Sequence, residues 1–255
     1  MMGTASERAT LKKTGWFLLG MSVLVLASLS PVPVQVWAWN GDHFQPESFP
    51  SSVQLRQPLV AGDLEGDGGR EQLVLASGVL TIFRGRQVVW RSPQGWEVDQ
   101  AAITDLDHDS KPEVTLLVWR KFAPWPIDRY IPAPGRIATF HDQDNRSCHL
   151  ILIGWRGGAM REVWAGSALA EPVRWFQVIA PPPGESNQVG KQILVTLDSL
   201  YASPPASPAL TLSAWEWNGF GFSLLSRQVG SFSQAVILSS DQAPASLAYI
   251  LTSRR

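Results

Sequence analysis

The 255-residue chain contains little cysteine and little charge, and each shortage excludes a class of protein. Its one cysteine, Cys148, excludes an internal disulfide and a cysteine-based zinc cluster. The formal net charge of −1 argues against a nucleic-acid partner, because such a surface needs clustered lysine and arginine to displace counterions from phosphate. Charged residues make up 17% and apolar residues 45% of the chain, so a packed core is expected rather than global disorder.

The main apolar run, residues 16–29, is short for a membrane span. As a helix it would cover about 21 Å, against about 30 Å for the hydrocarbon layer. It follows a basic patch and precedes two prolines, which is typical of an export signal. We therefore expect residues 1–32 to be a signal peptide or an uncleaved signal-anchor helix. The rest of the chain, 33–255, is expected to be extracytoplasmic, either secreted or attached on the outer side of a membrane through residues 14–30.

Glycine, proline and tryptophan are abundant, at 21, 19 and 12 residues. Some of the glycines and tryptophans recur along the chain with the same spacing. An aromatic-x-Gly signature occurs four times, each time between two strand-like stretches. Its copies are Trp39–Gly41, Phe83–Gly85, Trp155–Gly157 and Trp217–Gly219. The first and last copies match best, because five residues recur at one constant offset. They are Trp37, Trp39, Asn40, Gly41 and Phe44, which become Trp215, Trp217, Asn218, Gly219 and Phe222.

A second series marks another strand of the same repeat, at residues 59–62, 101–104, 175–180 and 234–239. Together the two series define a repeat of four antiparallel strands. Three continuous repeats are expected, at 57–96, 97–169 and 170–226.

The chain begins with the last two strands of a repeat, at 33–50, and ends with the first two, at 228–253. Because proteins avoid exposed sheet edges, these two halves are expected to pair with each other. The sequence therefore predicts an all-β fold, a small β-propeller of about four blades of four antiparallel strands, whose last blade is closed by the N- and C-terminal strands. An open array, or a five-bladed ring with one unrecognised blade, is the alternative.

Two acidic loops stand at the same place in neighbouring repeats. Residues 63–71 and 105–113 both carry acidic side chains at loop positions 1, 3, 5 and 9. Calcium takes about six to eight oxygen ligands, and a tight loop that presents alternate side chains, with a backbone carbonyl at position 7, can supply them. The expected ligands are Asp63, Glu65, Asp67, Gly69 and Glu71 in the first loop, and Asp105, Asp107, Asp109, Lys111 and Glu113 in the second. We expect up to two structural Ca²⁺ ions; a solvated acidic turn without metal is the alternative.

An EF-hand would need a carboxylate at loop position 12 as well. That position is Val74 in one loop and Leu116 in the other, and both residues continue strand-like runs. The EF-hand interpretation is therefore excluded.

The same segments resemble a known family. Val60–Gly68 and Ile103–Asp109 are similar to the FG-GAP/VCBS repeats of integrin-α-type β-propellers. The resemblance is specific over residues 57–119 and weaker over 147–253, where no loop carries acidic side chains at positions 1, 3, 5 and 9. It implies propeller blades with calcium in the loop that joins the first two strands of a blade, and a role in adhesion or ligand binding. The chain has room for about four blades, fewer than is usual in that family.

We expect an exported, non-enzymatic propeller, with no catalytic residues, that presents its loops to a protein or glycan partner. Trp125 lies outside the repeats, in a proline-rich excursion within residues 120–146, and is the expected ligand-binding ring. The alternative is a carbohydrate-active enzyme, or an accessory module, on a propeller scaffold. Carboxylates or histidines that converge on one rim would favour that alternative, as would His43, His141 and Asp142 clustered with an arginine in one cleft. His141 and Asp142 also fit a polar hairpin turn.

Overall fold

The computed structural model describes residues 34–49, 54–124, 130, 138–179, 191–239 and 248–253. The elements of these residues are the β-strands β1 to β17. Within this part of the chain, no helix is long and apolar enough to cross a membrane. The expected signal or anchor over residues 1–32 and the expected ligand-binding ring of Trp125 both lie outside the described residues.

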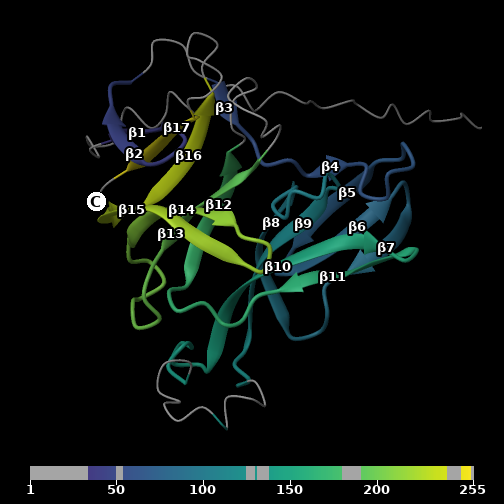
Figure 1. Ribbon diagram of the computed structural model, residues 1–255. Coiled ribbons are helices and arrows are strands. Elements are labelled where there is room, and N and C mark those ends of the chain that lie inside the picture. Colours follow the sequence, from purple (N-terminus) through teal and green to yellow (C-terminus); the bar gives the residue numbers. More distant parts are fainter. Residues whose placement is uncertain are drawn as a thin grey trace, which may run out of the picture. The chain divides into compact units, whose positions relative to one another are not determined.

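The strands form four antiparallel sheets, which we number as blades 1 to 4 in a four-bladed β-propeller arrangement (Figure 1). Blade 1 contains β4 (Ala61–Gly62), β5 (Glu71–Ala76), β6 (Val79–Arg84) and β7 (Gln87–Arg91). Blade 2 contains β8 (Trp96–Thr104), β9 (Glu113–Lys121), β10 (Arg146–Arg156) and β11 (Ala159–Ala165). Blade 3 contains β12 (Val173–Ile179), β13 (Ile193–Asp198), β14 (Ala209–Trp217) and β15 (Phe222–Phe232). The predicted repeat of four antiparallel strands is confirmed.

Blade 4 is built from both ends of the chain. It contains β16 (Gln234–Ser239), β17 (Ala248–Ser253), β1 (Val34–Trp39) and β2 (Phe44–Glu47). β1 pairs with β17 in an antiparallel register that runs from Val34 opposite Ser253 to Trp39 opposite Ala248. The buried indole of Trp37 donates a hydrogen bond to Thr252 Oγ1 at 3.1 Å. The prediction that the terminal strands complete one blade is confirmed.

One strand was not expected from the repeat. β3 (Gln54–Arg56) pairs with β16 and makes blade 4 a five-stranded sheet, in the order β2-β1-β17-β16-β3. All three of its residues are exposed. An edge strand invites pairing with other chains, and β3 covers that edge of β16 on the path from blade 4 to blade 1.

The aromatic-x-Gly signature forms hairpins in all four blades. In blades 3 and 4 the signature carries asparagine, and Asn218 shows why. Its side-chain oxygen accepts hydrogen bonds from the backbone N–H groups of Phe220 and Gly221, at 3.0 and 2.9 Å. The intervening Gly219 has a φ of 92°, a left-handed conformation that glycine adopts without steric cost. This turn places Trp217 opposite Phe222, as the equivalent turn in blade 4 places Trp39 opposite Phe44.

Three apolar clusters join neighbouring blades in the part of the chain that the structure describes. One includes Leu80 of blade 1 and Leu116 of blade 2, and a second includes Leu117 of blade 2 and Phe176 of blade 3. The third includes Leu212 of blade 3 and Trp37 of blade 4. Successive side chains of a strand point to opposite faces, so the middle of blade 2 can be apolar on both faces. That is why its strands have long, nearly continuous buried runs.

Candidate metal centre

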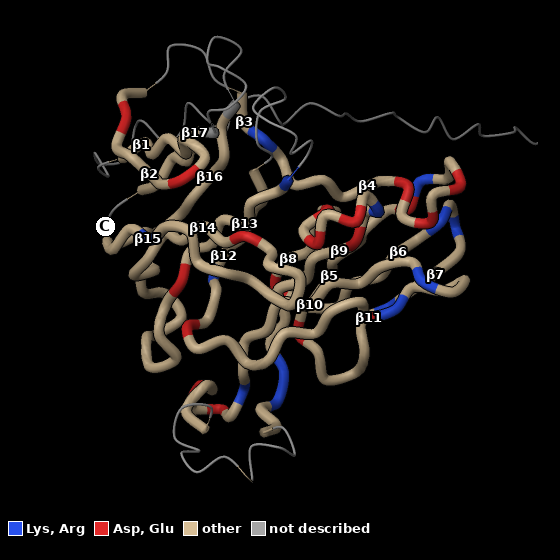
Figure 2. Tube along the Cα trace, viewed as in Figure 1, with Lys and Arg blue, Asp and Glu red and all other residues tan. Residues whose placement is uncertain are grey.

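The two acidic loops occupy equivalent places in blades 1 and 2. Residues 63–70 join β4 to β5, and residues 105–112 join β8 to β9, so each loop connects the first two strands of its blade. The glutamate at loop position 9 begins the second strand, where Glu71 lies opposite Gly62 and Glu113 opposite Thr104. Figure 2 shows acidic residues at these loops, with basic residues beside the loop that follows β4.

The position-9 glutamate closes each loop from inside. Oε2 of Glu71 accepts a hydrogen bond from the backbone N–H of Leu64 at 2.8 Å, and Oε1 of Glu113 accepts one from that of Leu106 at 2.5 Å. The two glutamates are 2% and 0% exposed, which is rare for a carboxylate unless it is paired. In both loops, therefore, one carboxylate oxygen holds the backbone. The other carboxylate oxygen of each glutamate still needs a hydrogen-bond donor or a cation.

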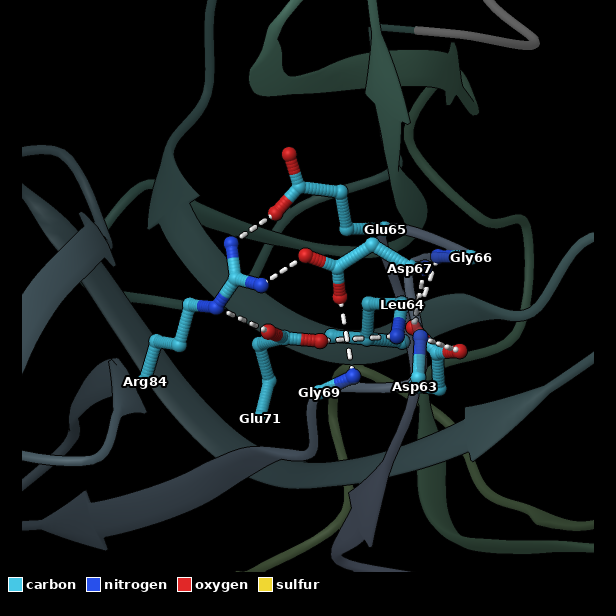
Figure 3. A network of polar contacts seen from close by, with 9 residues as sticks. Asp63, Leu64, Glu65, Gly66, Asp67, Gly69, Glu71 and Arg84 are labelled. Carbon is cyan, nitrogen blue, oxygen red and sulfur yellow. Dashed lines mark hydrogen bonds and ion pairs between the residues drawn. The ribbon is translucent and has the colours of Figure 1, made fainter.

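In the first loop, an arginine supplies the positive charge (Figure 3). Arg84, the last residue of β6, reaches across the hairpin to three loop carboxylates. Its Nη1 pairs with Glu65, its Nη2 pairs with Asp67, and its Nε lies 3.7 Å from Oε1 of Glu71. The N–H of Gly69 and then the Arg84 guanidinium lower the pKa of Asp67.

Asp63, at position 1 of the first loop, is used by the backbone. Its Oδ1 accepts hydrogen bonds from the N–H groups of Gly66 and Asp67, at 2.7 and 3.1 Å, and its Oδ2 accepts one from Gly68 at 2.8 Å. Every acidic side chain of this loop thus has a partner within the chain, although the buried Oε1 of Glu71 meets Arg84 only as an ion pair and makes no hydrogen bond in the described structure.

In the second loop, the carboxylates converge with less compensation. Asp105, Asp107 and Asp109 each bring an oxygen within 4.8 Å of the others. One arginine contacts this group: Nη2 of Arg156 lies 2.7 Å from Oδ2 of Asp109. Lys111 donates its backbone N–H to Oδ1 of Asp109 at 2.8 Å.

Two oxygens of the second loop are buried without a hydrogen-bond partner among the described residues, Oε2 of Glu113 and Oδ1 of Asp105. Burial, and then the charges of Asp107 and Asp105, raise the pKa of Glu113 to about 8. Burial also raises the pKa of Asp105. The second loop therefore holds two buried carboxylate oxygens without a hydrogen-bond partner in the described chain, and burial disfavours the ionised form of both groups.

Sequence reasoning did not identify the two arginines. Arg84 and Arg156 occupy the middle position of the signature in the two blades that have acidic loops. In the other two blades that position is Asn40 or Asn218. Arginine stands in the signature only in the two repeats that also have an acidic loop. This correlation could have predicted that the arginines contact the loop carboxylates.

His108, inside the second loop, was also not assigned a role. It has a φ of 61°, and both its ring nitrogens are buried without a hydrogen-bond partner in the described part of the chain. Burial lowers the pKa of His108, which favours the neutral ring. A neutral imidazole is a metal-ligand type, so the ring adds to the unsatisfied polar atoms of this loop.

His43, His141 and Asp142 do not share one cleft with an arginine in the described structure, although four carboxylates do line one cavity. Asp142 and Arg146 line a cavity of about 620 Å³, but neither His43 nor His141 is among its described lining residues. His141 Nδ1 instead contacts the carbonyl oxygen of Asp142 at 2.8 Å. The carboxylate of Asp142 accepts the N–H of Arg146, also at 2.8 Å, in the turn before β10. This arrangement agrees with the interpretation of these residues as a polar turn.

Neither a family model nor a curated protein matches the chain. Among solved structures, the chain is similar to the crystal structure of BBS1N in complex with ARL6DN, with 10% identity and a TM-score of 0.22 over 80% of this chain and 96% of that one. A TM-score this low carries no argument about function or ancestry. The blade assignment rests on the strand pairing itself.

Proposed function

We propose that the protein is an exported, non-enzymatic β-propeller scaffold, stabilised by Ca²⁺ at residues 105–113, that presents its loops to a protein or glycan partner. One observation carries the metal part of this proposal. The buried Oε2 of Glu113 has no hydrogen-bond partner in the described chain, and the oxygens of Asp105, Asp107 and Asp109 lie within 4.8 Å of one another, a group to which Glu113 does not itself belong. The sequence of residues 1–32 supports export.

A cation at this loop would remove an electrostatic cost. Carboxylates a few ångströms apart repel one another, and a buried carboxylate without a partner is strongly disfavoured. Calcium suits the donor set, because it accepts carboxylates and backbone carbonyls in flexible geometry. Asp105, Asp107, Asp109 and Glu113 would hold the ion, with the carbonyl of Lys111 as a further oxygen.

The first loop differs because Arg84 already meets three of its carboxylates. The expected second ion, at residues 63–71, stays a prediction, and the arginine contacts favour a single ion at residues 105–113.

The role proposed for the metal is structural. Leu106, the residue at loop position 2, is fully buried in the cluster between blades 2 and 3, so the loop's shape affects core packing. At about 1 mM free calcium and a dissociation constant of about 0.1 mM, ligation would add about 1.4 kcal/mol to stability. For a domain of this size, that corresponds to a rise in melting temperature of about 3–6 °C.

The test is a thermal melt of the full chain with calcium, with magnesium and with a chelator. We expect calcium to raise the melting temperature and Asp107→Asn to abolish that rise. The matched control is Asp67→Asn, the same change at position 5 of the first loop, which should keep the rise. Identical melts with calcium and chelator would reject the metal site, and loss of the rise in Asp67→Asn alone would place the ion in the first loop.

A further inference from the structure

A cavity of about 380 Å³ lies between blades 2 and 3, and its described lining shares no residue with the acidic loops. Its floor is apolar. Leu150, Val173 and Leu194 line it and are 4%, 4% and 0% exposed. Small-molecule sites have volumes of about 300–1,000 Å³, so this cavity has room for one small ligand group.

Aromatic side chains line one wall of this cavity, and two of them have buried counterparts in another blade. Trp164 of β11, Trp215 of β14 and Phe222 of β15 form its wall, and all three remain partly exposed. Trp215 and Phe222 have repeat equivalents in blade 4, Trp37 and Phe44, which are only 5% and 2% exposed. The rings at these two repeat positions are thus buried by neighbouring side chains in blade 4 but remain partly exposed in blade 3. Packing of the repeat alone does not account for the open rings.

Hydrogen bonds and a ring contact hold these aromatic side chains in place. The indole N–H of Trp164 donates to the carbonyl oxygen of Phe220 at 2.8 Å, and that of Trp215 donates to Thr196 Oγ1 at 2.9 Å. Trp164 also stands edge-on to Phe222, with ring centroids 5.4 Å apart and an interplanar angle of 83°. A ligand would meet fixed apolar ring faces, which reduces the entropy lost on binding.

The polar end of the cavity is equally fixed. Nη2 of Arg227 pairs with Glu171 at 2.9 Å, and its Nε donates to Ser213 Oγ at 3.1 Å. The guanidinium also lies over the ring of Trp215, 5.6 Å from its centroid. Asp198, 2% exposed, lies 3.8 Å from Arg227 and accepts a hydrogen bond from Ser213 at 2.5 Å. Donors and acceptors therefore stand side by side at the edge of an aromatic wall.

The charges at this end select against an ionic ligand. An anion would meet the carboxylate of Glu171, and a cation would have to displace Arg227. Burial raises the pKa of Asp198, which favours its uncharged form and leaves the Arg227–Glu171 pair without net charge. A neutral molecule with adjacent hydroxyl groups can donate to the carboxylate and accept from the guanidinium at once.

We propose that this cavity binds one neutral sugar ring, whose C–H face packs on Trp164 and Trp215 and whose hydroxyls pair with Arg227 and Glu171. The inference rests on the proposed role in partner binding and narrows the partner to a glycan.

The probes are the methyl glycosides of neutral hexoses and of N-acetylglucosamine, with glucuronic acid and glucosamine as charged counterparts. Saturation-transfer NMR on the full chain should show saturable binding of at least one neutral glycoside. Both charged sugars should bind at least about tenfold more weakly, since they leave a buried charge unpaired. Failure of every neutral glycoside to saturate, or equal binding of a charged sugar, would overturn the proposal.

Two variants locate the site. Arg227→Gln and Glu171→Gln should each weaken glycoside binding by about tenfold or more. The matched control is Arg146→Gln, because Arg146 also pairs with two carboxylates, Glu97 and Asp142, and lies over a tryptophan ring. Equal losses in the control and the site variants would place binding elsewhere. Should Arg227→Gln fail to fold, Glu171→Gln decides, since that side chain is 36% exposed.

The calcium melt is repeated on the same preparations, so that the two proposals fail separately. Glycoside binding without a calcium-dependent melt would remove the metal site and keep the cavity. A calcium-dependent melt without glycoside binding would do the reverse.

Discussion

Burial of His149 should make the propeller less stable in mild acid. His149 is 4% exposed in β10, and its Nδ1 and Nε2 lie 3.0 Å from the carbonyl oxygen of Gly166 and 2.7 Å from Oγ of Ser147. Nη2 of Arg120 lies 3.4 Å from the same Nδ1. Burial lowers the pKa of His149 to about 4, against 6.5 for the free side chain, and the Arg120 charge acts in the same direction.

The sign follows from proton uptake. The folded state binds the His149 proton more weakly than the unfolded state, so acid favours unfolding. Stability from this residue is complete above pH 6.5 and is lost as the pH falls from 6.5 to 4. The loss is about 2 kcal/mol at pH 5 and about 3 kcal/mol below pH 4. At pH 5 this corresponds to a fall in melting temperature of about 4–8 °C.

The measurement compares urea unfolding at pH 7, 6 and 5 for the parent and for His149→Gln, which cannot titrate. Calcium is kept saturating, because the raised pKa of Glu113 gives the metal-free loop a pH dependence of opposite sign. His43→Gln is the control for loss of an exposed histidine, with a side chain 54% exposed. We expect the parent and this control to lose stability in parallel, while His149→Gln changes less. The same slope in all three proteins would refute the reasoning.

Three further outcomes test the fold and the loops. Arg84→Ala should make the first loop depend on calcium, so that chelator lowers the variant's melting temperature more than the parent's; equal shifts would show that Arg84 is not the loop's counter-ion. Thr252→Val keeps the shape of the side chain but leaves the buried N–H of Trp37 without its acceptor, and should cost about 1–3 kcal/mol in urea unfolding. No change there would mean that the pairing of the terminal strands contributes little. Leu152→Ala, at a fully buried site between blades 2 and 3, should cost about 2–5 kcal/mol, and a cost below 1 kcal/mol would contradict the packing described.

The sequence was sufficient for the repeat and for its split blade. Tryptophan, asparagine and glycine at one constant offset mark the same hairpin twice, and Asn40 and Asn218 do accept the backbone N–H groups of equivalent turns. The acidic ladders also lie where the pattern indicated, between the first two strands of blades 1 and 2. These features depend on local spacing, which a sequence displays directly. β3 escaped prediction because a three-residue strand has no repeat partner.

The charge balance of the loops was harder to predict. Arg84 meets the first loop because β5 and β6 pair with Glu71 opposite Arg84, a cross-strand relation that a linear pattern does not state. The open rings of the cavity were also missed. Trp37 and Trp215 occupy equivalent repeat positions, and only the neighbouring blade decides which ring is buried. Sequence periodicity predicts where a side chain points but not what fills the space beyond it.

The pairing of β1 with β17 also affects when the fold can be completed. β1 pairs with β2 close by in the sequence, but its other neighbour, β17, lies far along the chain, so this second pairing must wait until residues 248–253 have been synthesised. Contacts between such distant parts of a chain form slowly. The seam that seals the blade would then be the last to form and, on heating, the first place to examine for opening.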